Sequence, residues 1–381
     1  MKFKKILALL LVFVLCLTVT ACTDKNVINS EVTTTAATTV ASTLSTEQTP
    51  EDITTQPTTQ ITTSQSTTVS TTTKATTPKT TAKQTTTSPT TKKQSTVPGS
   101  TPLLYKVTDS KGNVAWLFGS IHVGRKSMYP LPDYVMNAFK QSDSLAVEFD
   151  IIAYEKDLDA QIESVSKYLY TDRTTIRSHV TEETLNAAIE ILKANGLYDQ
   201  VWNYYCATVW ADLINGITYE RYSVFYEYGI DRYLINEAYK QNKEVLDVES
   251  ASFQSAMMAG FSDRLQEMLL KSAIEDYYEI SVNILEEHNT QIDIWSKGNE
   301  SIFAGYLNLG YEFESPQEEL LYQEYNKAMI TDRNKNMADY AEEALKSGKE
   351  VFICVGAAHV VGKGAMADLL KQRGYKVELV K

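Results

Sequence analysis

Short apolar runs alternate with amphipathic helical stretches from residue 101 to the end of the chain. Leu103–Thr108 and Val114–Ile121 are rich in β-forming residues and flank the turn sequence Asp-Ser-Lys-Gly-Asn at 109–113, which predicts a β-hairpin. Apolar runs of strand length recur later in the chain, at Ser144–Phe149, Glu244–Val248, Val351–Val355 and Lys376–Val380. The pattern therefore predicts a sheet of short strands.

The segments between these runs have the 3.6-residue apolar period of helices. One helix is predicted at Thr181–Asn195, where Thr181 is a good N-cap and Gly196 a stop signal. Further helices are predicted at Pro132–Gln141, Asp231–Gln241, Asp263–His288 and Gly364–Arg373, with two long helical blocks at about 153–228 and 252–347. Because the strands are few and the helices many, we expect an α/β fold with a small mixed or parallel sheet and a large helical insertion.

The first 21 residues have the pattern of an export signal. Lysines precede an apolar run of about 12 residues, which is too short to span a hydrocarbon core of ~30 Å. The following Val-Thr-Ala-Cys at 19–22 resembles a bacterial lipobox, which predicts a lipoprotein signal peptide at 1–21 and lipidation of Cys22. Two acyl chains on Cys22 would anchor the exported protein to the outer face of the membrane. The alternative is an ordinary secretory signal with an incidental cysteine.

Residues 22–100 are rich in Thr, Ser and Pro and contain no Phe, Tyr or Trp. Such a composition cannot bury a hydrophobic core, so we predict a disordered linker, or tether, between the membrane and the rest of the protein. All aromatic residues except Phe3 and Phe13 lie in 101–381, which is long enough for one substantial core. The predicted organisation is a signal peptide at 1–21, a linker at 22–100 and a single domain at 101–381.

Charge and cysteine usage narrow the class of protein. The formal net charge is −12, and residues 101–381 carry about −16 of it because the leader and linker are slightly basic. Nucleic-acid binding requires clustered Lys and Arg, so no nucleic-acid partner is expected.

Cys206 and Cys354 lie in apolar stretches and are predicted to be buried, and the sequence leaves open whether they form a disulfide.

Two of the four histidines occur in the same pattern, Gly-x-x-His, each directly after an apolar run of strand length. The two copies are Gly-Ser-Ile-His at 119–122 and Gly-Ala-Ala-His at 356–359. Two further strands end in acidic residues, namely Glu148 with Asp150 and Asp247 with Glu249. Because ligands bind at the carboxyl ends of strands in open α/β sheets, we expect His122, His359 and these acids at one edge of the sheet.

Histidines and carboxylates at one edge are the groups that a hydrolase needs. They can hold a divalent ion that acidifies a bound water, or a His or Glu can activate water directly as a general base. The structural alternative is a strand-terminal histidine that only makes hydrogen bonds. Of the other histidines, His179 precedes a helix and is expected at the surface, and His288 fits a position near a helix C-terminus. No serine-hydrolase elbow, phosphate loop or dinucleotide fingerprint occurs.

An ordered set of short segments resembles the TraB/PrgY/GumN family, which is related to the Tiki metalloproteases. The segments are Trp116–His122, Leu131–Pro132, Ser142–Glu148, Gly229–Asp231, Val245–Ser250, Asp332–Asn334, Val355–His359 and Gly374–Val377. The resemblance covers essentially all of 101–381 and none of the linker. A strand that usually ends in Leu-Glu-Thr ends here in Val248-Glu249-Ser250, which retains the Glu. The resemblance implies a split α/β core with a helical insertion.

Carried over position by position, the resemblance also implies a site, which consists of His122, Glu148, Asp231, Glu249, Arg333, Asn334 and His359. His122, His359 and Glu148 would hold a divalent metal ion, with Mn, Co and Zn as candidates, because Tiki-like members are described as metal-dependent proteases. Glu148, Asp231, Glu249, Arg333 and Asn334 would serve catalysis. Arg333 would stabilise an oxyanion or clamp a substrate carboxylate; the alternative is that it neutralises Glu148 or Glu249.

Together these features predict a hydrolase anchored at the cell surface through lipidated Cys22, with divalent-metal-dependent cleavage of peptides as the expected activity. Two alternatives stay open at this point. One is a non-catalytic surface protein that captures a peptide or small-molecule ligand, and the other is a metal-free, esterase-like hydrolase with His as the base. The sequence leaves open which bond is cleaved and whether the helical insertion is a lid or a dimer interface.

Overall fold

The computed structural model describes residues 100–221, 226–279, 282–307, 313 and 315–380. The predicted signal peptide, Cys22 and all but the last residue of the predicted linker lie outside these ranges. Within them, no helix is both long enough and apolar enough to cross a membrane.

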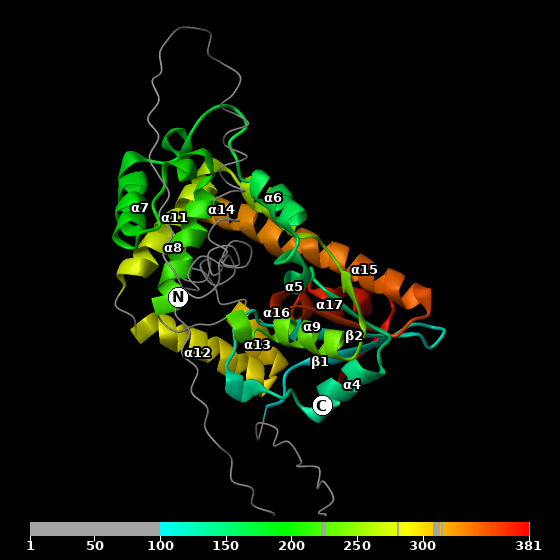
Figure 1. The fold of residues 1–381 in the computed structure, drawn as a ribbon. Helices are drawn as coiled ribbons and strands as arrows, with labels where there is room; N and C mark the ends of the chain where they lie inside the picture. Colours follow the sequence, from blue (N-terminus) through cyan, green and yellow to red (C-terminus); the bar gives the residue numbers. More distant parts are fainter. Residues whose placement is uncertain (1–99, 222–225, 280–281, 308–312, 314, 381) are drawn as a thin grey trace, which may run out of the picture.

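One mixed sheet with the strand order β4-β3-β5-β2-β1-β6 forms the centre of the fold (Figure 1). Its strands are β1 (Leu104–Thr108), β2 (Val114–Ser120), β3 (Ser144–Val147), β4 (Glu244–Asp247), β5 (Val351–Gly356) and β6 (Lys376–Val380). β1 runs antiparallel to β2 and β6, whereas β2, β5, β3 and β4 are mutually parallel. The predicted hairpin and the small mixed sheet are confirmed.

The two Gly-x-x-His motifs lie side by side, because β2 and β5 are neighbours in the sheet. Their register pairs Gly119 with Val355 and Ser120 with Gly356. A side chain at position 119 would collide with the second motif, since a Cβ built on Gly119 lies 2.8 Å from both Cα and Cβ of Ala357. Glycine at this position is therefore what lets the two motifs approach each other.

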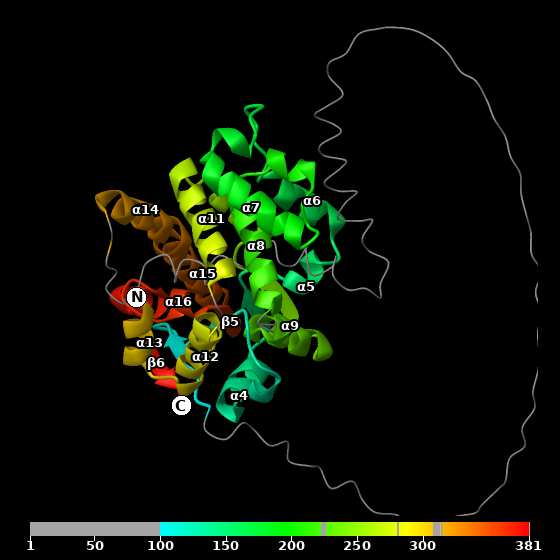
Figure 2. The same cartoon turned by 90° about the vertical axis from the view of Figure 1, so that its left-hand side faces the viewer.

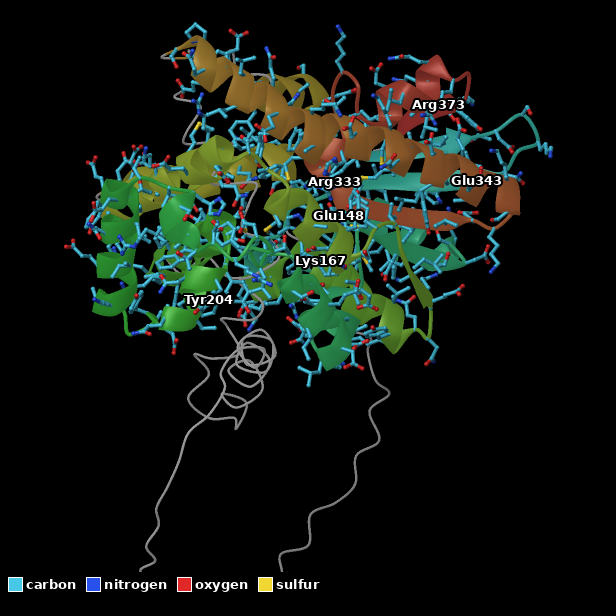
Figure 3. All side chains as sticks on the ribbon, turned by 90° about the horizontal axis from the view of Figure 1, so that it is seen from above. Glu148, Lys167, Tyr204, Arg333, Glu343 and Arg373 are labelled. Carbon is cyan, nitrogen blue, oxygen red and sulfur yellow. The ribbon has the colours of Figure 1, made fainter. Side chains whose placement is uncertain are left out.

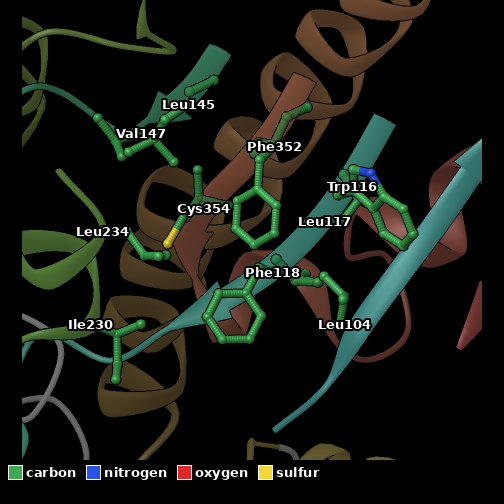
Figure 4. Packing of buried hydrophobic residues seen from close by; sticks show 14 of the residues in the cluster. Leu104, Trp116, Leu117, Phe118, Leu145, Val147, Ile230, Leu234, Phe352 and Cys354 are labelled. Atoms are coloured by element: carbon green, nitrogen blue, oxygen red, sulfur yellow. The ribbon is translucent and has the colours of Figure 1, made fainter. Parts of the chain in front are cut away.

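Helices cover both faces of the sheet, with α9 (Ile230–Lys240) and α4 (Asp133–Gln141) on one face and α15 (Arg333–Ser347) and α17 (Met366–Gln372) on the other (Figures 1 and 2). Figure 4 shows the contact between α9 and the strands, where Leu234 faces Cys354 and Phe352. All three side chains are almost fully buried. Cys354 and Cys206 are both buried free thiols and do not form a disulfide.

A second hydrophobic core lies apart from the sheet and belongs to the helical insertion. We use this name for the helices between β3 and β4 and between β4 and β5 that build the second core or lead into it: α5 (Ile151–Tyr154), α6 (Leu158–Ser166), α7 (Glu182–Ala194), α8 (Ala207–Arg221), α10 (Ala251–Ala259), α11 (Asp263–Tyr278) and α14 (Pro316–Asn326). The centre of this core is α8, which packs along α11 and buries Trp210 completely.

The predicted helix Asp263–His288 is wrong as a single element. α11 ends at Tyr278, where the backbone of Glu279 is extended, and α12 (Val282–Lys297) is a separate helix followed by α13 (Glu300–Leu307). Neither Gly nor Pro marks this break, and the apolar period continues across it, so the sequence contains no stop signal.

A long helical rod joins the two cores, seen as the orange α14 and α15 in Figure 1. Tyr325 near the end of α14 packs in the second core, whereas Met337 and Leu345 of α15 pack under the sheet. Between them, residues Lys327–Asp332 form a π-helical turn that ends at Arg333. Such turns are rare and often lie at functional sites.

The contact at Gly119 can be tested with Gly119→Ala. The added methyl group meets backbone atoms of Ala357, so we expect the free energy of unfolding to fall by about 1–3 kcal/mol. Gly305→Ala is the matched control, because nothing lies within 4 Å of a Cβ at that helical position. The control should be neutral or stabilising by up to about 1 kcal/mol. Urea unfolding of both variants gives the comparison, and equal effects would contradict the close approach.

The helical insertion contains a pH-dependent contact at Glu267. Its carboxylate accepts hydrogen bonds from the backbone and hydroxyl of Thr181, the N-cap of α7, at 3.0 and 2.5 Å. Partial burial disfavours the charge, but the bonds from Thr181 outweigh this effect and lower the pKa of Glu267 to about 2. The stabilisation is therefore complete above the ordinary value of 4.5 and is lost as the pH falls toward 2.

Glu267→Gln should lower the free energy of unfolding at pH 7 by about 1 kcal/mol, the size of a helix N-cap interaction. The difference from the unmodified protein should shrink as the pH falls from 4.5 toward 2. Thermal unfolding between pH 7 and pH 2, followed by circular dichroism, measures this. Glu190→Gln, at an exposed position of α7, is the control and should show no such convergence.

Candidate functional site

The carboxyl ends of the parallel strands bring most of the predicted site residues together. Glu148 directly follows β3, and Glu249 lies two residues beyond β4. His122 lies two residues beyond β2, and His359 lies in the short helix α16 (Ala357–Val360) after β5. The remaining three residues, Asp231, Arg333 and Asn334, come from the first turns of helices α9 and α15.

Arg333 lies between the two strand-end glutamates. Its NH2 atom donates to Glu148 Oε2 at 2.6 Å and to Glu249 Oε2 at 2.7 Å, and its Nε donates to both oxygens of Glu249 at 3.0 Å. The side chains of all three residues are at least 93% buried. Figure 3 shows Glu148 and Arg333 next to each other where the helical insertion meets the sheet. Of the three roles considered for Arg333, the structure displays the neutralising contact; stabilising an oxyanion and clamping a substrate carboxylate stay predictions.

The position of Arg333 depends on the π-helical turn that precedes it. NH1 donates to the carbonyl of Met329 at 3.4 Å, four residues back in the rod. Arg333 and Asn334 are consecutive, yet the first contacts the glutamates and the second contacts His359. The start of α15 thus delivers two side chains to two parts of the site.

Glu148 is held as an ion. Besides Arg333, its Oε1 accepts the backbone N–H of Gly356 at 2.9 Å, which ties the end of β3 to the second Gly-x-x-His motif. Burial disfavours the charged carboxylate, but Arg333, the two histidines and the Gly356 N–H together outweigh burial and hold the pKa of Glu148 far below its ordinary value. Glu148 is therefore ionised at neutral pH.

His122 and Asp231 form a pair. Nδ1 of His122 lies 2.8 Å from Oδ2 of Asp231, so the carboxylate fixes the proton on Nδ1 and the lone pair on Nε2. The pair is assembled by the backbone, because the N–H of Ile230 donates to the carbonyl of Ile121 at 3.0 Å. Burial opposes the charged imidazole, but the charge and hydrogen bond of Asp231, together with the charge of Glu148, outweigh it and raise the pKa of His122. The His122 side chain is 28% exposed, so it is open to a substrate.

His359 occupies the same position in the second Gly-x-x-His motif as His122 does in the first, but it is buried. Its Nδ1 lies 2.7 Å from the amide oxygen of Asn334, and only 4% of the residue is exposed. Since an amide oxygen accepts, Nδ1 carries the proton and Nε2 carries the lone pair. Burial, reinforced by the positive charge of Arg333, lowers the pKa of His359 to about 3, so the ring is neutral near neutral pH.

The two rings and Glu148 surround Gly356. A Cβ on this glycine would lie 3.2 Å from Glu148 Oε1, 3.4 Å from Cδ2 of His359 and 3.9 Å from Nε2 of His122. Two imidazoles oriented through Nδ1 and one carboxylate are a donor set that fits a divalent metal ion. As placed, however, no three His, Cys, Asp or Glu side chains in the described ranges are grouped tightly enough to hold one. The donor types fit, and the metal itself stays a proposal.

Some acids expected near the site do not join it. Asp247 accepts the backbone N–H of Asp150, and Asp150 caps α5 through the N–H groups of Ile152 and Ala153. Both are therefore committed to the local backbone. His179, predicted at the surface, is partly exposed there: its ring stacks on Tyr170 and its Nδ1 lies 3.0 Å from Asp263, which leaves the side chain 15% exposed. The side chain of His288 lies outside the described residues.

Two buried residues at the site were not predicted. Gln254 of α10 donates to both Glu148 and Glu249, at 3.0 and 3.1 Å. Trp295 of α12 donates its indole N–H to the carbonyl of Gly119 at 2.8 Å and so holds the end of β2. A Gln or Trp inside a helical pattern is usually an ordinary packing residue, and no motif distinguishes these two.

A cavity of about 950 Å³ lies near the site without including it. Its walls come from the junction of α12 and α13 and from the loop at 362–364, with Lys297, Lys363 and Lys371 among the lining residues. None of the seven predicted site residues lines it. The link between the two is Asn334, whose Nδ2 donates to the carbonyl of Gly364 at 2.9 Å.

Comparison with known proteins shows which family the chain belongs to. The chain is similar to "Uncharacterized protein YbaP" from Escherichia coli (strain K12) and to the protein of the same name from Shigella flexneri. Each is 24% identical over 255 residues, which cover 67% of this chain and 87% of the relative. No solved structure shows a significant match. The TraB/PrgY/gumN family matches residues 103–379, and the chain therefore belongs to the TraB/PrgY/gumN family.

Proposed function

We propose that this chain is a divalent-metal-dependent hydrolase that cleaves peptide bonds on the outer side of the cell membrane, where lipidated Cys22 anchors it. His122, His359 and Glu148 would hold the metal. When bound, a divalent ion supplies an acidified water and polarises the carbonyl under attack. The contacts and charges of the chain's own residues support this proposal, and the linker and the lipobox-like Cys22 support the location.

The charge of the buried site is the observation that carries the proposal. The site contains three carboxylates and a single arginine: Arg333 pairs with Glu148 and Glu249, whereas Asp231 pairs with His122. With neutral histidines the cluster has a formal charge of −2, and a buried net charge is costly unless it is compensated. Protonation of His122 leaves −1 uncompensated, whereas a divalent cation balances the cluster.

The chain's own residues have distinct tasks in this proposal. Asp231 and Asn334 hold a proton on Nδ1 of His122 and His359, which directs both Nε2 lone pairs away from these partners. Arg333 fixes both Glu148 and Glu249 and helps to keep Glu148 ionised. His122 is the partly exposed member, so substrate reaches the site from its side.

A metal-free hydrolase is the second candidate, and a specific observation favours it. The carboxylate–histidine pair of Asp231 and His122 has the arrangement in which an Asp orients a histidine base, with Nε2 left to accept a proton from water or a hydroxyl. Its raised pKa makes His122 a stronger base than an isolated imidazole. This candidate needs no three-donor metal site.

Binding of Mn²⁺ to the purified protein, followed by calorimetry, tests the metal role. His122→Ala and His359→Ala each remove a proposed ligand, so each should lower the Mn²⁺ affinity by more than the ~10–100-fold typical for loss of a group that merely orients a ligand. His179→Ala is the matched control, because His179 also pairs with an aspartate but lies in the helical insertion. The control should leave the affinity unchanged.

Cleavage of a peptide library, with and without EDTA, separates the remaining possibilities. Cleavage that requires Mn²⁺ and both histidines supports the proposal. Cleavage that persists in EDTA and depends on His122 supports the metal-free hydrolase instead. Retention of a peptide without any product would indicate a capturing protein, and Mn²⁺ binding that survives both His→Ala changes would rule out this metal site.

The His122–Asp231 pair can be tested without metal. Because the carboxylate of Asp231 is what raises the pKa of His122, Asp231→Asn should lower that pKa in the metal-free protein. The protonated fraction of His122 at neutral pH should fall accordingly. Nuclear magnetic resonance titration of the His122 ring measures the change. Asp263→Asn is the control, because Asp263 pairs with His179 and should leave the titration of His122 unchanged. An unchanged His122 titration in Asp231→Asn would contradict the pairing.

A further inference from the structure

We infer that the helical insertion completes the candidate site through Gln254, a positioning residue that holds Glu148 and Glu249 in place without neutralising them. The inference rests on the proposed function, because that proposal is what gives Glu148 and Glu249 a role in chemistry. The hydrogen bonds of Gln254 to the two glutamates do not depend on a bound metal.

Gln254 and Arg333 bind the same two oxygen atoms. Oε2 of Glu148 accepts from Gln254 Nε2 at 3.0 Å and from Arg333 NH2 at 2.6 Å. Oε2 of Glu249 accepts from the same nitrogens at 3.1 and 2.7 Å. Two nitrogens and two oxygens thus form a closed ring of hydrogen bonds. Gln254 is 4% exposed, so water does not compete for these bonds.

The amide supplies what the arginine cannot. The Oε2 atoms of the two glutamates accept from the same nitrogens, so the two carboxylates lie close together. Two carboxylate charges this close repel each other strongly in a buried site. Arg333 compensates one of the two charges, and a second cationic side chain would compensate the other and cancel the attraction for a metal ion. Gln254 donates both hydrogens of one NH₂ group while it adds no charge. The site therefore keeps its geometry and its negative charge together.

The start of α10 explains how Gln254 reaches the sheet edge. Ser250 directly follows Glu249 and caps the helix, with its hydroxyl accepting the N–H of Phe253 at 3.1 Å. Gln254 lies one turn into the helix, and helical side chains lean toward the N-terminus, so its amide points back to the end of β4.

The same helix connects the site to the insertion. Ala251 at its start belongs to the sheet core, and Met258 near its end belongs to the second core. α10 also packs along α6. Gln254 lies between these two anchors, so the placement of the insertion sets the placement of its amide. The insertion is therefore part of the site.

Gln254→Met tests the inference, because methionine preserves the length and removes the donor. The matched control is Gln266→Met: Gln266 is also 4% exposed, on α11, and its amide donates to two backbone carbonyls far from the glutamates. Both changes remove buried hydrogen bonds, so both should lower the thermal midpoint. Only Gln254→Met should lower the Mn²⁺ affinity, by about 10–100-fold.

A second readout does not depend on metal. The Nε–H of Arg333 donates to Glu249 and gives a resonance in protein labelled with ¹⁵N-arginine, identified by its loss in Arg333→Lys. This resonance should shift in metal-free Gln254→Met and stay in place in Gln266→Met. If Gln254→Met leaves both the resonance and the Mn²⁺ affinity as they were, the inference is overturned. If the unmodified protein binds no Mn²⁺ but the resonance shifts, the metal proposal fails and the positioning role of Gln254 stands.

Discussion

The structure is organised around one buried interaction, the guanidinium of Arg333 between the carboxylates of Glu148 and Glu249. Taking three charges out of water is costly, and only close geometry with further hydrogen bonds compensates for it. Glu148 accepts from the Gly356 N–H in the sheet and from Gln254 of α10. Arg333 donates to the Met329 carbonyl in the π-helical turn. The ends of β3 and β4 and the start of α15 therefore cannot shift independently of one another.

The two Gly-x-x-His motifs look alike in sequence and differ in the folded protein. His122 faces a carboxylate and is partly exposed, so its pKa is raised; His359 faces an amide, is buried and lies near Arg333, so its pKa is lowered to about 3. His122 therefore takes up a proton more readily than an ordinary imidazole, whereas His359 remains neutral near neutral pH. Pairs of titratable groups driven apart in this way are characteristic of sites that carry out acid–base or metal chemistry.

The site lies where two hydrophobic cores meet. The sheet core supplies the strand ends, and the helical insertion supplies Gln254, while the rod of α14 and α15 runs through both cores and places Arg333 between them. A change in the relative placement of the cores would therefore alter the spacing of the two glutamates. This arrangement gives the insertion a direct physical connection to the proposed chemistry.

The sequence by itself determined the hairpin, the strand-end motifs and the α/β class, because apolar periodicity and strand–helix alternation are local properties of the chain. It also led to the seven candidate residues, through the ordered motifs of the TraB/PrgY/gumN family. Only the tertiary structure decided how they pair: Asp231 with His122, Asn334 with His359, and Arg333 with both glutamates. It alone separated α11 from α12 and revealed Gln254. These pairs lie 25 to 185 residues apart in the sequence, so their formation depends on strand order and helix packing, which no local pattern encodes.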